Sequence, residues 1–280
     1  MYLAVDIGGT ITLIALFSRH GRVIRRRKFK TAQGKERFFR ELQANLKDFA
    51  RPSIKAVAVA IPGYIKFDTS EQKICSVRLG NRDWGWFDIT TPIKKLFSCP
   101  IYFENDANLA AIYESKGIVG KTVFLTFSTG IGGGLAENGQ LIEAPDFEPG
   151  HVQYWYDGKI KEWEDIASSS ALEKVYHVNY ATDLRKKAIM QDVARRVYLG
   201  LPDIAKKYHP DTMILGGPLG KIFRLYVKYL PDDLGVKYRR PKRPNESVIY
   251  GCYLFARQAR QQERKVQKER KDRRGRKGRK

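Results

Sequence analysis

Apolar and polar positions divide the first sixty residues into short strand-like runs and one helix-like stretch. The runs are four to eight residues long and either alternate or stay apolar throughout, which is typical of β-strands. The helix-like stretch repeats its large apolar residues every three or four positions. In chain order the pattern predicts three strands, a helix and a fourth strand at 2–5, 11–17, 22–29, 36–49 and 56–61.

A similar order of strands begins again about 120 residues further along the chain. The predicted elements there are strand 101–103, helix 107–115, strand 123–127, a strand from 135, helices 164–177 and 186–208, strand 212–215 and a last helix 247–264. Pro202 falls inside one of these helical patterns and should kink or split that helix. The repeated strand pairs indicate a weak internal duplication, as two lobes of one topology would produce.

The composition is that of a globular protein. Hydrophobic residues make up 42% of the 280 residues, and no run approaches the roughly 18 apolar residues of a membrane helix. The N-terminus reaches Asp6 without a basic segment and an apolar core, so we expect no signal peptide. Three scattered cysteines, at 75, 99 and 252, predict neither a disulfide framework nor a zinc cluster. A reduced, cytoplasmic setting is the simplest interpretation.

The charge is unusual. The formal net charge is +22, and residues 257–280 alone carry 13 Lys or Arg against three acids. A field of this size should attract polyanions such as nucleic acid, polyphosphate or nucleotides. The alternative is a solvated tail that only keeps the chain soluble, because a run of charge carries no chemistry of its own.

Glycine-rich loops follow three of the predicted strands, at 6–10, 128–134 and 215–218. Glycine lets backbone N–H groups approach phosphate oxygens without a Cβ in the way, and a neighbouring acid can hold hydrated magnesium. One such loop alone is more often an ordinary hairpin turn. Three of them on strand ends, the first with Asp6 in front of its glycines, favour phosphate binding.

Asp106 is the best candidate for a base that orients and deprotonates an attacking hydroxyl. It follows an apolar strand, precedes a helix of small residues and has Asn105 beside it to bind a polyol. The alternative role is a helix N-cap, and both roles can hold at one position. Glu148 and His151 offer an acid and an imidazole around a turn, although a surface acid and a structural histidine would look the same. Glu164 faces a similar doubt, because acids are favoured in the first turn of any helix.

These segments, in this order, resemble the motifs of the ROK family of sugar kinases and related repressors. The matching segments are the first phosphate loop, the catalytic segment, the second phosphate loop, a Glu-x-Gly-His sugar motif and the adenosine-side turn, at 6–10, 104–111, 129–134, 148–151 and 213–217. The likeness runs from about residue 2 to residue 258.

The resemblance implies a role for each candidate residue. Asp106 would be the base for the 6-hydroxyl of a glucose-like hexose. The sugar ligands would be Asn105, Glu148, His151, Glu164 and Gly63. Phosphate and magnesium contacts would come from Asp6, Gly8, Gly9, Thr10, Thr129 and Gly130, with Asp6 holding Mg²⁺ through water. Gly216 and Gly217 would lie near the nucleoside.

The resemblance also implies an α/β, actin-like (ribonuclease H-like) ATPase fold with two lobes and a cleft between them. The N-terminal lobe would span 1–105, with a helix at 248–262 packed back on it, and the C-terminal lobe 106–247. Residues 263–280 would form a basic, disordered tail able to contact polyanions. A homodimer is expected, with no membrane partner.

The sequence departs from the family in two ways: a Lys common after the Thr of the first loop is absent, where Ile11 and Thr12 follow Thr10, and a zinc site is missing. Many members carry a cysteine-rich zinc site after the Glu-x-Gly-His motif, whereas 153–163 contains no cysteine. Structural zinc is therefore not expected, and His151 needs another means of orientation; Trp155 and Trp163 are candidates for packing there. Because it lacks this zinc site, the chain resembles the polyphosphate-using glucokinases of the family. The expected phosphoryl donor is therefore ATP or polyphosphate.

Two functions follow from these patterns. The first is a hexokinase- or glucokinase-type phosphotransferase that uses Mg²⁺ and acts on glucose or a similar hexose. The alternative is a sugar-responsive regulator of the same family that binds nucleic acid through its basic surface.

Overall fold

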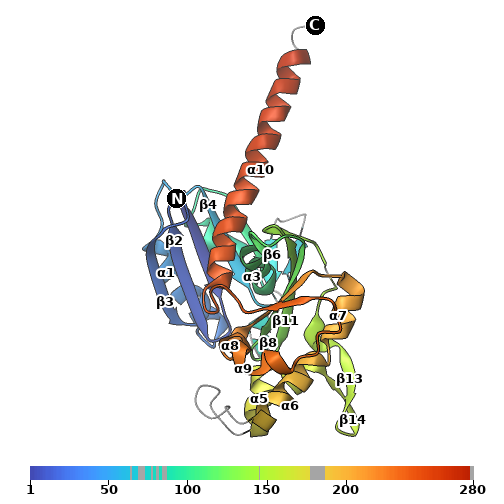
Figure 1. Ribbon diagram of the computed structural model, residues 1–280. Coiled ribbons are helices and arrows are strands. Elements are labelled where there is room, and N and C mark those ends of the chain that lie inside the picture. Colours follow the sequence, from blue (N-terminus) through green and yellow to red (C-terminus); the bar gives the residue numbers. More distant parts are fainter. Residues whose placement is uncertain are drawn as a thin grey trace. The chain divides into compact units, whose positions relative to one another are not determined.

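The computed structural model describes residues 1–63, 65–68, 73–76, 78–79, 82–83, 87–144, 146–176 and 187–277. It divides into two compact units (Figure 1). Unit 1 comprises Met1–Asp106 and Ile249–Lys280, and unit 2 comprises Ala107–Val248.

Unit 1 is built on a five-stranded sheet of order β3-β2-β1-β4-β9. Its strands are β1 (Tyr2–Ile7), β2 (Ile11–Phe17), β3 (Val23–Lys30), β4 (Ala56–Ile61) and β9 (Ile101–Asn105). The first three are antiparallel neighbours, and β1, β4 and β9 run parallel. The unit also contains α1 (Lys35–Lys47), α2 (Thr90–Lys94) and the short strands β5 (Ile65–Asp68), β6 (Lys73–Ser76), β7 (Arg78–Leu79) and β8 (Arg82–Asp83).

Burial explains which segment becomes which strand. Every residue of β4 is buried, as expected for a central strand covered on both faces. Helix α1 turns Phe38, Leu42 and Leu46 into the core, which is the stripe that its spacing predicts. By contrast, β3 is an edge strand with an exposed basic surface, and charge on an edge discourages pairing with other chains.

Helix α10 (Ser247–Lys277) belongs to unit 1 through its first half. The Tyr253 ring stacks on Phe17 with centroids 4.9 Å apart, and the Cys252 thiol lies 3.7 Å from the Val5 carbonyl oxygen. The helix continues to Lys277, whereas the sequence predicted an end near Arg264 and a disordered tail. Arg, Lys, Gln and Glu are good helix formers, so the pattern of charge alone did not reveal this extension.

Unit 2 has a sheet of order β12-β11-β10-β15-β16. Its strands are β10 (Lys121–Phe127), β11 (Ile131–Glu137), β12 (Gln140–Leu141), β15 (Thr212–Gly216) and β16 (Lys237–Arg239). Three antiparallel strands are followed by two parallel ones, which is the connectivity of the sheet in unit 1. The internal duplication predicted from the sequence is therefore present in the topology.

Helices and one hairpin complete unit 2. They are α3 (Asp106–Ser115), whose first residue belongs to unit 1, η1 (Pro149–His151), β13 (Gln153–Tyr156), β14 (Lys159–Glu162), α4 (Trp163–Ala167), α5 (Ser169–Tyr176), α6 (Lys187–Tyr198), α7 (Leu201–Tyr208), α8 (Gly217–Lys221), α9 (Phe223–Tyr226) and η2 (Val227–Tyr229). The split expected at Pro202 is confirmed, because α6 ends before it and α7 begins beside it. The single helix predicted over 164–177 is two helices, since Ser168 interrupts it and its Oγ accepts a hydrogen bond from the Ala171 N–H.

Candidate active site

The first glycine loop joins β1 to β2 and is held by a chain of hydrogen bonds. The Gly8 N–H donates to the Ile11 carbonyl at 3.0 Å, and a Cβ on Gly8 would lie 2.7 Å from that oxygen. The turn is therefore too tight for any side chain at position 8. Gly9 and Thr10 complete the loop, and Thr10 is exposed at its tip.

Thr31, just after β3, supports this loop through two hydrogen bonds. Its hydroxyl donates to the Gly8 carbonyl at 2.7 Å, and its backbone N–H donates to the Thr10 carbonyl at 2.9 Å. The hydroxyl has one proton, so the Thr12 hydroxyl, 2.9 Å away, must donate to it. Both threonines are buried. The sequence analysis missed this pair, since nothing in the local pattern links positions 23 residues apart.

Asp6 and Asp106 lie at one edge of the sheet in unit 1. Asp6 is near the end of β1, and Asp106 follows β9 directly. Strands β1, β4 and β9 are parallel, with Asp6 opposite Ala60 and Ala60 opposite Glu104, so their carboxyl ends meet at the same edge. Burial raises the pKa of Asp6 to about 7, and the negative charge of Asp106 adds to the rise.

Asn105 ends β9 beside these acids. Its side-chain amide donates to the Gly63 carbonyl at 3.3 Å, and its backbone N–H donates to the Glu104 carboxylate at 2.8 Å. Gly63 has a φ of 98°, a conformation that favours glycine. Unit 1 thus contains four of the predicted residues, Asp6, Gly63, Asn105 and Asp106, at or just after the carboxyl ends of β1, β4 and β9.

A carboxylate from α4 supports the second glycine loop, in unit 2. Glu164 accepts a hydrogen bond from the Ile131 N–H at 3.2 Å through Oε2. A Cβ on Gly130 would lie 2.4 Å from the same oxygen, and one on Gly150 would lie 2.8 Å from it. These two glycines therefore make room for the carboxylate, while Thr129 stays exposed at the loop's tip.

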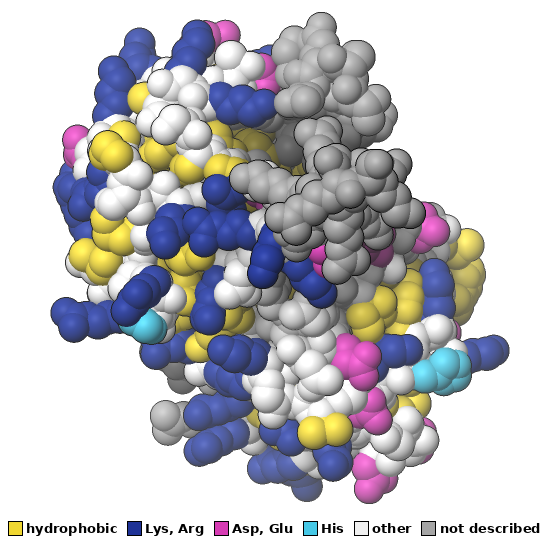
Figure 2. Space-filling view, turned by 90° about the horizontal axis from the view of Figure 1, so that it is seen from above, with side chains coloured by type: hydrophobic (Ala, Val, Ile, Leu, Met, Phe, Trp, Pro, Cys, Tyr) yellow, Lys and Arg dark blue, Asp and Glu magenta, His cyan; other side chains and the backbone are white. Residues whose placement is uncertain are grey.

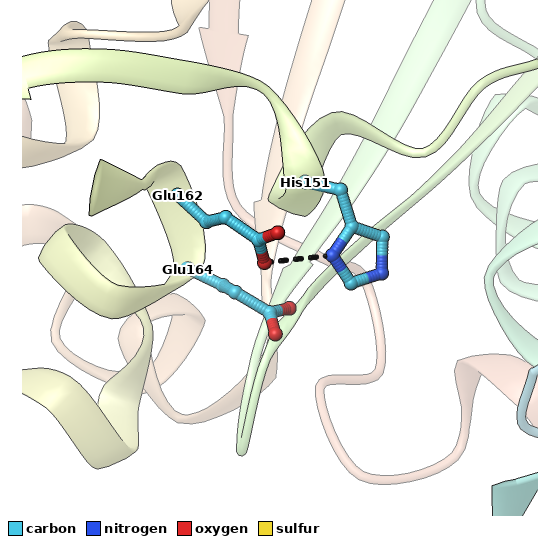
Figure 3. A group of neighbouring side chains, drawn as sticks. All are labelled: His151, Glu162 and Glu164. Carbon is cyan, nitrogen blue, oxygen red and sulfur yellow. Dashed lines mark hydrogen bonds and ion pairs between the residues drawn. The ribbon is translucent and has the colours of Figure 1, made fainter. Parts of the chain in front are cut away.

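Glu162, His151 and Glu164 form a cluster in unit 2 (Figure 3). The Nδ1 atom of His151 lies 2.9 Å from Oε2 of Glu162, and the Glu164 carboxylate points into the same space. The Glu162 hydrogen bond is the main cause that raises the pKa of His151 above its ordinary value. Burial raises the pKa of the nearby Glu148, with Glu164 adding to the rise and His151 opposing it. Glu162 was not among the residues predicted from the sequence.

Trp163 anchors this cluster, whereas Trp155 does not. The Trp163 side chain is fully buried, its ring packs on Gly200, and its Nε1–H donates to the Arg196 carbonyl at 3.0 Å. Trp155 is 72% exposed on β13, so the packing role suggested for it was wrong. The alternating pleat of a hairpin turns Trp155 outward.

Gly216 and Gly217 have a packing explanation of their own. A Cβ on Gly216 would lie 2.6 Å from the Phe124 ring, and one on Gly217 would lie 2.3 Å from the Phe127 carbonyl. Gly217 also has a φ of 68°. The turn from β15 into α8 therefore requires both glycines.

The donor atoms of unit 1 suit a hard cation. Asp6 and Asp106 raise each other's energy when both are charged, and Mg²⁺ prefers carboxylate and water oxygens. A hydrated Mg²⁺ held by Asp6 would therefore relieve this repulsion. In unit 2, donor atoms of His151, Glu162 and Glu164 lie within 4.8 Å of one another, but Nδ1 of the histidine is already engaged by Glu162.

Comparison with known proteins identifies the family. The model of a family described as the ROK family matches residues 2–240. The chain belongs to the ROK family. The actin-like fold predicted from the sequence is confirmed with it.

Curated relatives of this ROK chain match over part of their length. The chain is 34% identical over 154 residues to an N-acetylmannosamine kinase of Escherichia fergusonii, covering 54% of this chain and 52% of the relative. It is 28% identical over 143 residues to a fructokinase of Lactococcus lactis subsp. cremoris, covering 50% of this chain and 48% of the relative. In these matches the chain spans about half the length of the curated relatives.

Solved structures match over nearly their whole length. A ROK family glucokinase from Streptomyces griseus, in complex with glucose and AMPPNP, has a TM-score of 0.69 at 21% identity and covers 92% of this chain and 99% of its own. An inorganic polyphosphate/ATP-glucomannokinase from Arthrobacter sp. strain KM has a TM-score of 0.68 at 22% identity, covering 90% and 96%. At such identities the likeness establishes the shared fold. Among the helices in the described part of this ROK chain, none is long and apolar enough to span a bilayer.

Proposed function

We propose that this ROK protein is a sugar kinase that transfers a phosphoryl group from ATP to a hydroxyl of a hexose, with Asp106 as the base. The observation that carries the proposal is the pair of carboxylates at the ends of parallel strands, Asp6 beside the tight glycine loop and Asp106 at the start of α3. Phosphoryl transfer needs both a phosphate-and-metal side and a base side, and these two acids supply them.

Each residue has a distinct task in this reaction. Asp106 accepts a hydrogen bond from the attacking hydroxyl, orients it and takes its proton. Backbone N–H groups of the glycine loops bind phosphate oxygens, and Asp6 holds Mg²⁺ through water. When bound, Mg²⁺ offsets the negative charge of the phosphoryl group that is being transferred. Asn105, Glu148, His151 and Glu164 bind the sugar's other hydroxyls.

The sugar and the donor are the finer parts of the proposal. The named relatives are an N-acetylmannosamine kinase and a fructokinase, so the acceptor class is a hexose or an N-acetylhexosamine, and glucose with its 6-hydroxyl is one member of it. ATP is the proposed donor, with polyphosphate as the second donor to test because of the high positive charge. A homodimer and a cytoplasmic location complete the proposal.

A coupled phosphorylation screen tests the proposal. Purified protein with Mg²⁺ is crossed against ATP and polyphosphate as donors, and against glucose, mannose, fructose, allose, N-acetylglucosamine and N-acetylmannosamine. Turnover with at least one pair is expected. If no pair turns over while a sugar still raises the melting temperature, the protein binds sugar without being a kinase.

Asp106→Asn tests the base. The substitution keeps the shape and removes the proton acceptor, so kcat should fall by at least about 100-fold while the KM for the sugar changes little. Asp232→Asn, at an exposed position in unit 2, is the matched control and should leave kcat unchanged. Wild-type turnover in Asp106→Asn would contradict the assignment of the base.

The regulator alternative is not favoured. A protein that only binds sugar and nucleic acid has no need of two neighbouring carboxyls at the strand ends, where burial and the charge of Asp106 raise the pKa of Asp6 to about 7. Burying a carboxylate that has no function costs stability. The burial of Asp6 therefore favours a catalytic role for this edge of the sheet.

A further inference from the structure

Among the proposed sugar ligands, His151 needs its ring orientation and its protonated nitrogen fixed as well as its position. A neutral imidazole has one N–H and one bare nitrogen, and which nitrogen faces a ligand depends on the partner of the other. In this structure Nδ1 lies 2.9 Å from the Glu162 carboxylate. A carboxylate only accepts hydrogen bonds, so the proton of the neutral ring sits on Nδ1.

We propose that Glu162 is a positioning residue for His151, which it holds in the Nδ1–H form so that Nε2 faces the sugar. The inference deepens the proposed function and rests on it. The carboxylate fixes both the tautomer and the rotation of the ring, leaving Nε2 to bind a sugar hydroxyl. Glu162 itself touches no substrate in this account.

The β13–β14 hairpin brings Glu162 next to the His151 ring. Gln153 and Glu162 face each other in the first pair of the ladder; Gln153 lies two residues after the end of η1, and Glu162 directly precedes α4. The turn at Asp157 and Gly158 has φ values of 55° and 75°, as in a two-residue hairpin turn of type I′. A hairpin of this register returns the chain to His151 after eleven residues, and a one-residue slip would turn Glu162 to the opposite face.

The base of the hairpin is fixed on both sides. The Trp163 N–H donates to the Val152 carbonyl at 2.9 Å, which closes the ladder next to Glu162. The fully buried Trp163 ring then ties that end to the core of unit 2. The carboxylate is thus held by a rigid backbone, as a positioning group must be.

Glu164, although it lies in the same cluster, has a different task. Its Oε2 is engaged by the Ile131 N–H and fits the space that Gly130 and Gly150 leave. Among the three side chains drawn in Figure 3, it is Glu162 that accepts the hydrogen bond from the Nδ1–H of the imidazole. Both partners are 38% exposed, so the ring can reach a ligand.

Steady-state kinetics separate positioning from a merely structural role. In Glu162→Ala the ring loses its partner, so the KM for the preferred sugar should rise by about 10- to 100-fold, while the KM for ATP stays within about twofold. Glu162→Gln keeps an oxygen that can accept from Nδ1–H and should restore most of the lost affinity. Glu173→Ala, which removes an exposed glutamate from α5, is the control for charge and should change neither constant.

The tautomer gives a readout that does not need activity. Nitrogen NMR of labelled protein reports which ring nitrogen carries the proton, and His151→Gln assigns the signal among the four histidines. We expect the Nδ1–H form at His151 in the wild type and a shift toward the usual Nε2–H form in Glu162→Ala. An unchanged tautomer, or an unchanged sugar KM in Glu162→Ala, would overturn the proposal. If the wild type turns over no sugar, the proposed kinase function fails, and the NMR comparison still decides whether Glu162 orients the ring.

Discussion

At the scale of single residues, Asp6 combines burial with a neighbouring charge. Its pKa of about 7 lies well above the ordinary value near 4, so the unfolded chain ionises this carboxyl at lower pH than the folded chain does. Ionising it in the folded state costs free energy, and this cost grows as pH rises from about 4 to about 7 and is then constant. The stability contributed by Asp6 is therefore lost toward high pH.

Asp6→Asn should consequently stabilise the metal-free protein. Above pH 7 the free energy of unfolding should rise by up to about 4 kcal/mol, and below pH 4 the difference should vanish. Denaturant unfolding in the presence of a chelator, at a series of pH values, measures this. On the proposed function Mg²⁺ should stabilise the wild type, and the same variant should lose both this stabilisation and the kinase activity. Parallel pH profiles for the two proteins would show that Asp6 titrates normally.

At the scale of elements, the first glycine loop depends on the hydroxyls of Thr12 and Thr31, which hold its backbone. Thr31→Val keeps the shape of the side chain but removes the proton donated to Gly8, leaving the Gly8 carbonyl and the Thr12 hydroxyl without that partner. We expect a loss of about 1–3 kcal/mol in unfolding free energy and a raised KM for the phosphoryl donor. Thr31→Ser should recover most of both.

Thr122 offers a matched control for this loop. Its hydroxyl is also buried on a strand, and it has no hydrogen-bond partner among the residues that the structure describes. Thr122→Val should therefore be neutral or slightly stabilising, since it removes an unpaired polar group. Equal effects of Thr31→Val and Thr122→Val would mean that the Thr31 hydroxyl does not support the loop.

The elements themselves could be predicted because periodicity is a local signal. The buried run of β4, the stripe of α1 and the break at Pro202 each follow from residues within one turn or a few strand positions. The partners of the site could not be predicted in this way. Glu162 meets His151 only because a hairpin of fixed register folds back, and Thr31 meets Gly8 only through the pairing of β2 with β3.

At the scale of the whole molecule, positive charge is the main feature that the proposed reaction does not use. Lys and Arg side chains occupy many places on the face seen in Figure 2. In unit 1, exposed Lys and Arg residues occur on β3 and on the part of α10 between Arg264 and Lys268, and α10 extends beyond the sheet in Figure 1. Such a surface should concentrate polyanions at low ionic strength.

Two truncations of α10 separate its two halves. Packing on Phe17 and Val5 ends near Ala256, and Arg260 and Glu263 still pair at 3.0 Å, so a chain ending at Glu263 should fold and keep its kinase activity with ATP. It loses a net charge of +9, and its binding to polyphosphate or nucleic acid should weaken and become less dependent on salt. A chain ending at Val248 lacks the buried first half and should destabilise unit 1, because Tyr253 and Cys252 fill the face of β1 and β2. If the chain ending at Glu263 binds polyanions with the full salt dependence of the wild type, the contact lies on β3 or elsewhere on the body, and the helical tail has no part in it.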